Sequence, residues 1–517
     1  MRACWTCLNA VGLLLIAAAF APDSVCRVTL TLTDANTGLP LPGVVRITCH
    51  EADQRVVLKP SVLDSRGWGL LAKQPDIADW FVVPQVVTTE LPRRVVTFEA
   101  FSGLETEITK VELDLSNGQP REVSIPLKRF HKFYERGWRS ANTHLHLMKL
   151  TRAESDRYLR DFPAADGLDV LFVSHLKRAG ADQDYITNQY PIGRLKFLET
   201  RGVLVSNGEE HRHNFGAGGE GYGHVMLLGL KELVQPVSIG EGIAKTPPDF
   251  PSLAMGLETA HQQDGTAIWC HNNWGFEDIP NWLAGRLDAQ NIFDGGSHGS
   301  FADSFYHYLN AGLKVPFSTG TDWFMDDFAR VYAEVEGNLT PESWLAALRA
   351  GRTVITNGPL LEFRVNNSRI GDTLDLKQPG EVTVTANVIG RSNFELLEII
   401  QNGQVIASES SAGTAGHFTA TIRKPIKVSE PGWLAARIST ANRNEYGRTL
   451  FGHTSAIYVR LDGRSIRRSA DVAWLRHEVE AARATIVEKA QFDPVRRTEQ
   501  RTKVLGLYDQ ALQKLSE

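Results

Sequence analysis

Five short apolar segments between residues 169 and 318 constrain the fold of this chain more than any other feature. They span residues 169–173, 202–206, 225–228, 267–269 and 314–318, and helix-like stretches separate them. Apolar strands that alternate with helices predict an α/β domain built around a sheet. We place this domain at residues 137–360, because on either side of it the pattern changes to short runs of alternating apolar and polar residues.

Polar side chains follow four of these five predicted strands, at the point where each strand ends, and segment 225–228 is the exception. In α/β barrels and open parallel sheets the connecting loops converge at the carboxyl ends of the strands, so active sites lie there. The sequence therefore predicts a functional site formed by Ser174-His175, Asn207-Gly208-Glu209-Glu210, His271-Asn272-Asn273 and Thr319-Gly320-Thr321-Asp322.

Patterns outside the α/β domain predict three further units, as a chain of 517 residues allows. Apolar and polar residues alternate at 26–130 and again at 361–462, which indicates a β-sandwich on each side of the α/β domain. The stretch 33–44 resembles the carboxypeptidase regulatory-like sandwich, an accessory module. Helical spacing at 469–517 predicts a tail, interrupted at Asp493-Pro494, that covers the sheet domain or makes an oligomer contact.

The N-terminal segment predicts export to the periplasm or the medium. Arg2 precedes an apolar run at 10–21 that ends in the small residues a signal peptidase recognises, so residues 1–21 are expected to be a signal peptide. The run is shorter than the ~20 residues of a spanning helix, although an uncleaved anchor is the alternative, because Pro22 disfavours cleavage. After cleavage only Cys26 and Cys49 could form a bridge, and Cys270 is expected to be a buried strand thiol.

Charge and composition exclude two classes of partner. The chain has 55 basic and 60 acidic residues, which gives a formal net charge of −5. This balance provides no basic excess that would draw the protein to nucleic acid or to anionic lipid. We therefore expect a small-molecule substrate, no nucleic acid, and no membrane span after removal of the signal.

The pair His144 and His146 is the first candidate for metal binding. Two histidines that lie two positions apart on a strand point to one face and can bind one ion. The chain contains 15 histidines, so such pairs also arise by chance, and His211 with His213 is a second one. From spacing alone, a solvated surface strand is an equal alternative.

Potential ligands at the predicted strand ends strengthen the metal interpretation. His175, Glu210, His271 and Asp322 supply imidazole and carboxylate groups, which suit Zn²⁺, Mn²⁺ or Fe²⁺. Each has an ordinary alternative: a helix cap for His175 and Asp322, a surface acid for Glu210, and a core position for His271. Their shared position at strand ends of one domain favours a common site.

The motifs around these residues resemble, in order, those of the PHP superfamily and specifically its CehA/McbA branch. Segment 137–146 is similar to the opening motif Gly-Trp-x-Ser-Gly-Asp-x-His-x-His. The later motifs are matched by segments 167–175, 208–210 with 223–225, His271, 320–322 and 351–359. The resemblance covers about residues 137–372 and implies a distorted PHP-type barrel with hydrolase activity.

Carried over position by position, the resemblance assigns ligands and catalytic groups. His144, His146, Glu210 and Asp322 would hold one ion, and Glu210 would bridge to a second ion held by His271. His175 matches a ligand of a third position. Asp322 would also serve as general base, and His175 or His224 would protonate the leaving group, with a structural role for His224 as an equal alternative.

Two departures from the family pattern reduce the expected number of ions to one or two. Phe324 stands where the last motif has a histidine, and Ser174 replaces the aspartate before His175. A divalent cation would lower the pKa of a bound water to around 7, so that metal-bound hydroxide attacks an amide, carbamate, ester or phosphoester. The alternative is an exported binding protein with a degenerate PHP-like domain and sandwiches that bind a surface polymer.

Two further features are expected beside the ligands. Trp274, Phe276 and Trp282 form an aromatic wall for the substrate or belong to the core. The glycine-rich stretch 216–223 is expected to be a mobile active-site loop.

Overall fold

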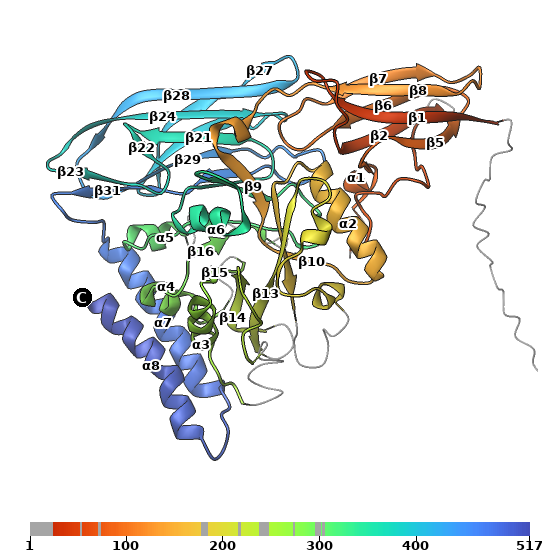
Figure 1. The fold of residues 1–517 in the computed structure, drawn as a ribbon. Helices are drawn as coiled ribbons and strands as arrows, with labels where there is room; N and C mark the ends of the chain where they lie inside the picture. The colour runs from red at the N-terminus through yellow and green to blue at the C-terminus, as the bar shows by residue number, and fades with distance from the viewer. Residues whose placement is uncertain are drawn as a thin grey trace, which may run out of the picture.

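The computed structural model describes residues 24–51, 54–70, 74–176, 185–215, 219–236, 248–271, 275–294, 301 and 305–517. The predicted signal peptide, Trp274 and residues 216–218 of the predicted loop lie outside these ranges. β-sheet predominates, helices flank the central region, and a pair of helices ends the chain (Figure 1). Within the described ranges, no helix is long and apolar enough to cross a membrane.

Two small sheets that share one core form the N-terminal region. One sheet contains β5 (Val87–Pro92), β1 (Val25–Asp34) and β8 (Arg121–Leu127), and the other contains β3 (Gln54–Leu58), β2 (Gly43–Glu51), β6 (Val95–Phe101) and β7 (Thr109–Asp114), with β4 (Phe81–Val83) beside β2. In β1, alternate residues from Cys26 to Leu32 are buried, as a period of two predicts. Cys26 and Cys49 both lie in this core as free thiols, so no bridge joins them.

The central region is built on a row of strands that contains all five predicted segments. In spatial order the row is β17 (Phe317–Ser318), β16 (Ala289–Asn291), β15 (Thr266–Trp269), β14 (Gly219–Leu228), β13 (Leu204–Phe215), β11 (Val170–His175) and β9 (Trp138–Asn142). It continues through β19 (Arg330–Glu334) and β20 (Thr353–Thr356) into the C-terminal region. The sheet is therefore continuous from the central to the C-terminal region.

The direction of β14 distinguishes this sheet from a purely parallel one. β14 runs antiparallel to both β13 and β15, whereas β9, β11 and β13 are parallel, and so are β15, β16 and β17. The carboxyl end of β14 therefore lies at the opposite edge of the sheet from those of its neighbours. This explains why segment 225–228 was the one predicted strand that did not end in polar residues.

A two-stranded sheet connects the two ends of the row. The chain that leaves β9 forms β10 (Leu145–His146), the chain that leaves β17 forms β18 (Asp322–Trp323), and these two strands pair in parallel. Gly320 allows the close approach, because a Cβ there would lie 2.6 Å from the Cβ of His144. The connection brings the predicted ligands of the first and last strands together.

Helices and a second β region complete the central and C-terminal parts. The helices of the central part are α2 (Arg152–Ala165), α3 (Leu253–Gln262), α4 (Asp278–Ala284), α5 (Phe305–Asn310) and α6 (Pro341–Arg349). The C-terminal strands form the sheet β22 (Ser368–Arg369), β21 (Leu360–Val365), β24 (Gly380–Gly390), β28 (His417–Val428) and β27 (Ala412–Thr414). The end of the large sheet lies beside it, with β30 (Gly452–Thr454), β29 (Gly432–Ser439), β25 (Leu396–Gln401), β26 (Gln404–Ser410), β31 (Ile457–Leu461) and β23 (Thr373–Leu376).

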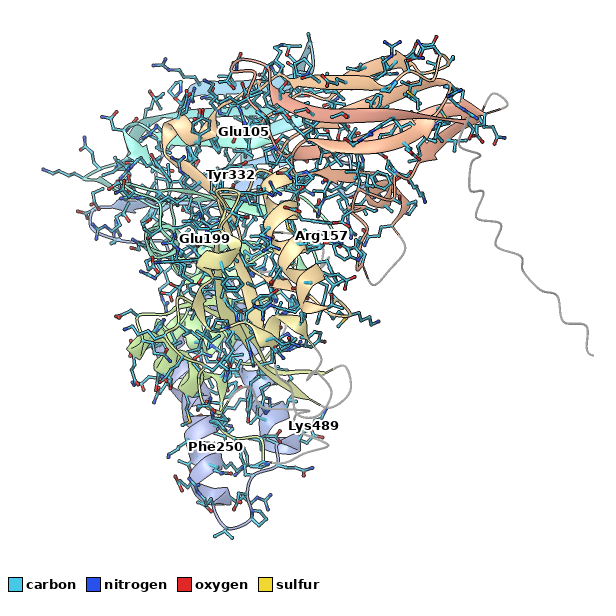
Figure 2. All side chains as sticks on the ribbon, turned by 45° about the vertical axis from the view of Figure 1, so that its right-hand side comes forward. Glu105, Arg157, Glu199, Phe250, Tyr332 and Lys489 are labelled. Atoms are coloured by element: carbon cyan, nitrogen blue, oxygen red, sulfur yellow. The ribbon has the colours of Figure 1, made fainter. Side chains whose placement is uncertain are left out.

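The predicted helical tail is a hairpin of α7 (Ser469–Lys489) and α8 (Arg497–Ser516). It packs against α4 and α5, and Leu475, Val479 and Ile486 are among its buried residues. Figure 2 shows Phe250 beside the end of α7 that carries Lys489, and the backbone N–H of Asp249 donates to the carbonyl of Gln491. The hairpin therefore covers the central region, which is the first of the two roles expected for it.

Candidate metal centre

His144 and His146 lie at the connection between the two ends of the row. His146 belongs to β10 and His144 immediately precedes it. Both side chains are fully buried, and the two Nε2 atoms are 3.1 Å apart. The two rings therefore point to one place, as their spacing predicts, but inside the protein and not on a solvated strand.

The Nδ1 atom of each ring, which points away from the other histidine, lies within hydrogen-bond distance of an acceptor. His144 Nδ1 lies 2.7 Å from Asp294 Oδ2, and His146 Nδ1 lies 3.1 Å from the carbonyl oxygen of Ser174. An ionised carboxylate and a carbonyl accept hydrogen bonds and donate none, so each Nδ1 carries a proton and donates it to its acceptor. Both Nε2 atoms then face the same point, where each can offer a lone pair to a metal ion once it holds no proton.

Glu210 and Asp322 each direct one carboxylate oxygen at this point. Glu210 Oε2 lies 2.8 Å from His146 Nε2 and 3.7 Å from His144 Nε2. Asp322 Oδ1 lies 3.2 Å from His144 Nε2 and 3.6 Å from His146 Nε2. Two imidazoles and two carboxylates within these distances need positive charge between them, which protons supply in the absence of an ion and a metal ion could supply when bound. The cluster could therefore hold a divalent metal ion.

Burial and charge act in opposite directions on this cluster. Burial alone would lower the pKa of His144, but the nearby Asp322 and Asp294 raise that pKa well above its ordinary value. Without an ion His144 therefore holds a second proton, which a metal ion would displace. Burial alone would raise the pKa of Glu210, but Arg212 and the two histidines hold that pKa well below its ordinary value. Glu210 is therefore ionised at neutral pH, which a metal ligand requires.

The backbone at two of the predicted ligands adopts a conformation that L residues rarely adopt. Asp322 has φ of 58° and His271 has φ of 63°, in the left-handed region. Such a conformation costs on the order of 1–3 kcal/mol and persists only where the surroundings hold it. Strain of this kind is typical of functional sites.

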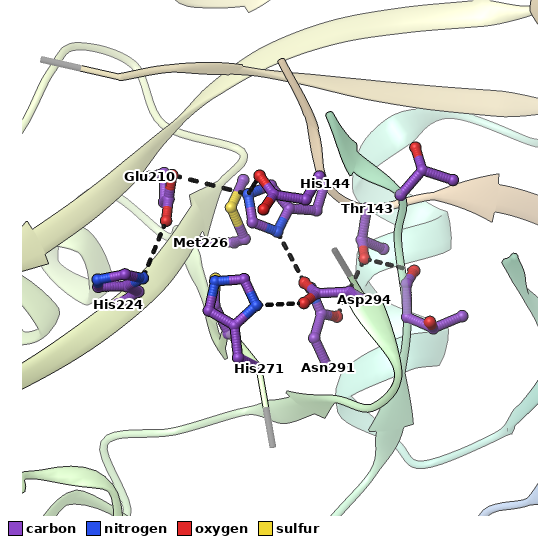
Figure 3. Close-up of polar contacts among 12 residues, drawn as sticks. Thr143, His144, Glu210, His224, Met226, His271, Asn291 and Asp294 are labelled. Atoms are coloured by element: carbon purple, nitrogen blue, oxygen red, sulfur yellow. Dashed lines mark hydrogen bonds and ion pairs between the residues drawn. The ribbon is translucent and has the colours of Figure 1, made fainter. Parts of the chain in front are cut away.

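Asp294 connects the first cluster to His271. Its Oδ2 lies 2.7 Å from His144 Nδ1, and its Oδ1 lies 2.5 Å from His271 Nδ1 (Figure 3). Asn291 Nδ2 donates to Oδ2 at 2.9 Å. Burial would raise the pKa of Asp294, but His271 and His144 hold that pKa far below its ordinary value. One carboxylate therefore orients two imidazoles.

Glu210, His224 and His271 form a second group of potential ligands. His224 lies opposite Arg212 in the pairing of β13 with β14. Its Nδ1 is 3.4 Å from Glu210 Oε1, and Arg212 Nη2 donates to its Nε2 at 3.0 Å. Burial, together with the charge of Arg212, lowers the pKa of His224 well below its ordinary value, so its ring is neutral at pH 7.

A third group contains His144, Cys270 and Asp294. Cys270 is buried directly after β15, in agreement with the predicted buried thiol. Burial raises the pKa of this thiol to about 12, so it stays protonated at neutral pH. Because the thiolate is the form that binds metals, this group is the weakest candidate of the three.

Two predicted positions lie apart from these groups. His175 ends β11 beside Glu209 of β13, and it belongs to none of the three groups found among the described residues. The Phe324 side chain is fully buried, contacts Tyr158 at 5.7 Å between ring centroids, and lies against Gly69. Phe324 therefore contributes to the apolar core next to the first cluster and leaves its four ligands in place.

Trp323 and Tyr185 form an aromatic surface beside the first cluster. The Trp323 ring centroid lies 5.0 Å from that of His146 and 5.2 Å from that of Tyr185. Trp282, by contrast, lies in the core and donates from Nε1 to Gln290 Oε1. Phe276 packs against the same core, so these two residues follow the core alternative of the prediction.

Sequence reasoning missed Asp294 and Arg212. Asp294 lies three residues after the end of β16, so it carries the same signal of a polar residue beyond a strand. β16 has only three residues and was not predicted. Arg212 lies inside β13, where strand pairing with His224 places it, and nothing in the sequence reveals that pairing.

Comparisons with known proteins identify no family for the chain. No family model and no curated protein matches it. Among solved structures, the crystal structure of an engineered protein matches with 13% sequence identity over 59% of this chain and 52% of the other, at a TM-score of 0.16. A likeness this low identifies neither a fold nor a function for the chain.

Proposed function

We propose that the chain is a divalent-metal-dependent hydrolase of the PHP type that holds its ion between His144, His146, Glu210 and Asp322. One observation carries the proposal: two imidazole Nε2 atoms and one oxygen from each of two carboxylates converge at one buried point, while both Nδ1 atoms face acceptors on the outside. The connection of β10 to β18, which joins the two ends of the row, is compatible with a distorted barrel.

The chemistry of the donor set fits a hydrolytic ion. Two imidazoles and two carboxylates suit Zn²⁺, Mn²⁺ or Fe²⁺. When bound, such a cation lowers the pKa of a water and polarises the bond under attack, which serves amides, carbamates, esters and phosphoesters alike. The fold does not choose among these substrates.

The exposure of the four ligands assigns them different roles. Glu210 and the two histidines are at most 1% exposed, whereas the Asp322 side chain is 11% exposed. Asp322 therefore lies on the side that a substrate can reach, and its carboxylate could take a proton as general base. His224 is fixed between Arg212 and Glu210, which favours its structural alternative over proton donation.

Hydrolysis by metal-stripped and metal-reloaded protein tests the proposal. The full chain would be treated with a chelator, reloaded with Mn²⁺, Zn²⁺ or Fe²⁺, and assayed on p-nitrophenyl acetate, an aryl carbamate and bis(p-nitrophenyl) phosphate. We expect hydrolysis of at least one substrate to depend on the ion. Less than about half an ion per chain and no turnover would favour the exported binding protein instead.

Asp322→Asn separates a catalytic role from a structural one. The amide is a poorer ligand and no base, so turnover should fall by about 10²–10⁴ while the melting temperature changes little. Asp264→Asn is the matched control, since Asp264 has φ of 65° but an exposed side chain, and it should be neutral. Activity of Asp322→Asn within about threefold of the parent would remove Asp322 from the mechanism.

A further inference from the structure

Arg212 lies inside the second group of potential ligands. Its Nη2 donates to His224 Nε2 at 3.0 Å, and its Nε lies 3.5 Å from Glu210 Oε1. The Arg212 side chain is only 11% exposed, so its charge is largely held within the site. In other respects this group has the composition of a metal site.

The contact with Arg212 decides where the proton of His224 resides. A guanidinium has five N–H donors and no acceptor, so the Nε2 atom that faces it must present a lone pair. The proton of the neutral ring is then on Nδ1, which is the atom 3.4 Å from Glu210 Oε1. His224 therefore directs an N–H group toward Glu210, and its one lone pair, on Nε2, faces Arg212 and not a metal ion.

A cation in the second group would require Arg212 to leave. If His224 Nδ1 bound a metal, Nε2 would carry the proton and would face the Arg212 N–H at 3.0 Å, two donors against each other. An ion on Glu210 Oε1 would also lie beside the guanidinium, and two positive charges repel strongly in a buried site. Both arguments exclude a structure in which a metal ion and the Arg212 guanidinium occupy the second group together.

From this geometry we infer that Arg212 takes the place of a second metal ion, so that the site holds one ion per chain. Glu210 then divides its carboxylate: Oε2 faces the ion between the histidines, and Oε1 faces Arg212 and His224. His271 keeps its contact with Asp294. The inference rests on the proposed function, because it presupposes the first ion.

Metal content of Arg212 variants tests the inference. The amide oxygen of Arg212→Gln can accept a proton from Nε2, which frees Nδ1 as a ligand, and the substitution removes the charge. Arg212→Lys keeps the charge and the donor. After loading with Mn²⁺ or Co²⁺ and removal of free ion, we expect one ion per chain for the parent and for Arg212→Lys, and close to two for Arg212→Gln. Adding His224→Ala to Arg212→Gln should return the content to one.

Each outcome has a distinct meaning. Two tightly bound ions in the parent would overturn the inference and leave the proposed function intact. One ion in both the parent and Arg212→Gln would also overturn the inference, because removal of the guanidinium would then have created no second metal site. A parent protein that binds no ion would contradict both the inference and the proposed function. The d–d absorption bands of the Co²⁺ protein report the change in coordination independently of turnover, and Arg194→Ala, on neighbouring β12 (Gly193–Arg194), is the matched control.

Discussion

Two pairs of histidines with identical spacing meet different surroundings in this molecule. His144 and His146 bring their Nε2 atoms to 3.1 Å from each other. His211 and His213 on β13 are equally buried, but their rings have different partners: His211 Nδ1 lies 2.8 Å from Glu209 Oε1, whereas His213 stacks on Tyr222. The second pair belongs to no group of potential ligands within the described part of the chain.

The spacing of two histidines alone is therefore not sufficient for a metal site. Along β13, residues 209, 211 and 213 face one side and residues 210 and 212 face the other. On the first side each histidine has a carboxylate of its own: Glu209, whose Oε2 also accepts from the backbone N–H of Val234, lies beside His211, and Asp249 Oδ1 lies 3.5 Å from His213 Nε2. Histidines become ligands where free carboxylate oxygens converge on them, and tertiary structure decides where that happens.

Removal of each pair is the strongest test of this comparison. His144→Ala with His146→Ala should leave less than about a tenth of the parent metal content and abolish hydrolysis, because two of four ligands are gone. His211→Ala with His213→Ala should keep the metal and lose about 1–3 kcal/mol of stability, because Glu209 and Asp249 lose partners. Metal analysis and thermal unfolding of both variants provide the readout. If only the variant without His211 and His213 lost its metal, the metal site would have to be assigned to the second pair.

Asp294 orients His144 of the first pair together with His271, because each of its carboxylate oxygens accepts from one Nδ1 atom. Asp294→Asn should weaken metal binding by about 10–100-fold, because the neutral amide no longer fixes the tautomers of His144 and His271. Titration of the stripped protein with metal measures the change. Asp278→Asn is the control, as Asp278 is also buried but accepts from Tyr308 away from the cluster. Equal metal affinity in the two variants would contradict the role of Asp294.

The sequence predicted the four ligands of the first cluster, although Glu210 lies inside β13, which continues to Phe215, and not after the end of the predicted strand at residue 206. His144, His146, Glu210 and Asp322 do converge, although only the resemblance suggested that they would share one ion. The reversed direction of β14 was not predictable, since alternation of apolar residues does not encode strand direction. Arg212 depends on that reversal, because antiparallel pairing places it beside His224.

The pH dependence of stability gives the smallest expected effect and concerns the second pair. Burial, partly offset by Asp249, lowers the pKa of His213, so the unfolded chain binds a proton more readily than the native protein. The native state is therefore destabilised as pH falls below about 6.5, by at most about 1.4 kcal/mol per pH unit. His213→Phe, which keeps an aromatic ring on Tyr222, should reduce this slope and leave the part that comes from other buried histidines such as His224. Urea unfolding at pH 7.5 and 5.5 measures it, and an unchanged slope would show that another group titrates.

Anomalous diffraction from crystals of the metal-loaded protein would locate the ion. We expect one strong peak per chain, about 2.0–2.2 Å from His144 Nε2, His146 Nε2, Glu210 Oε2 and Asp322 Oδ1. We expect no comparable peak beside His211 and His213. A loaded crystal without density between the first pair, or with its ion bound at the second pair, would contradict the proposed metal site.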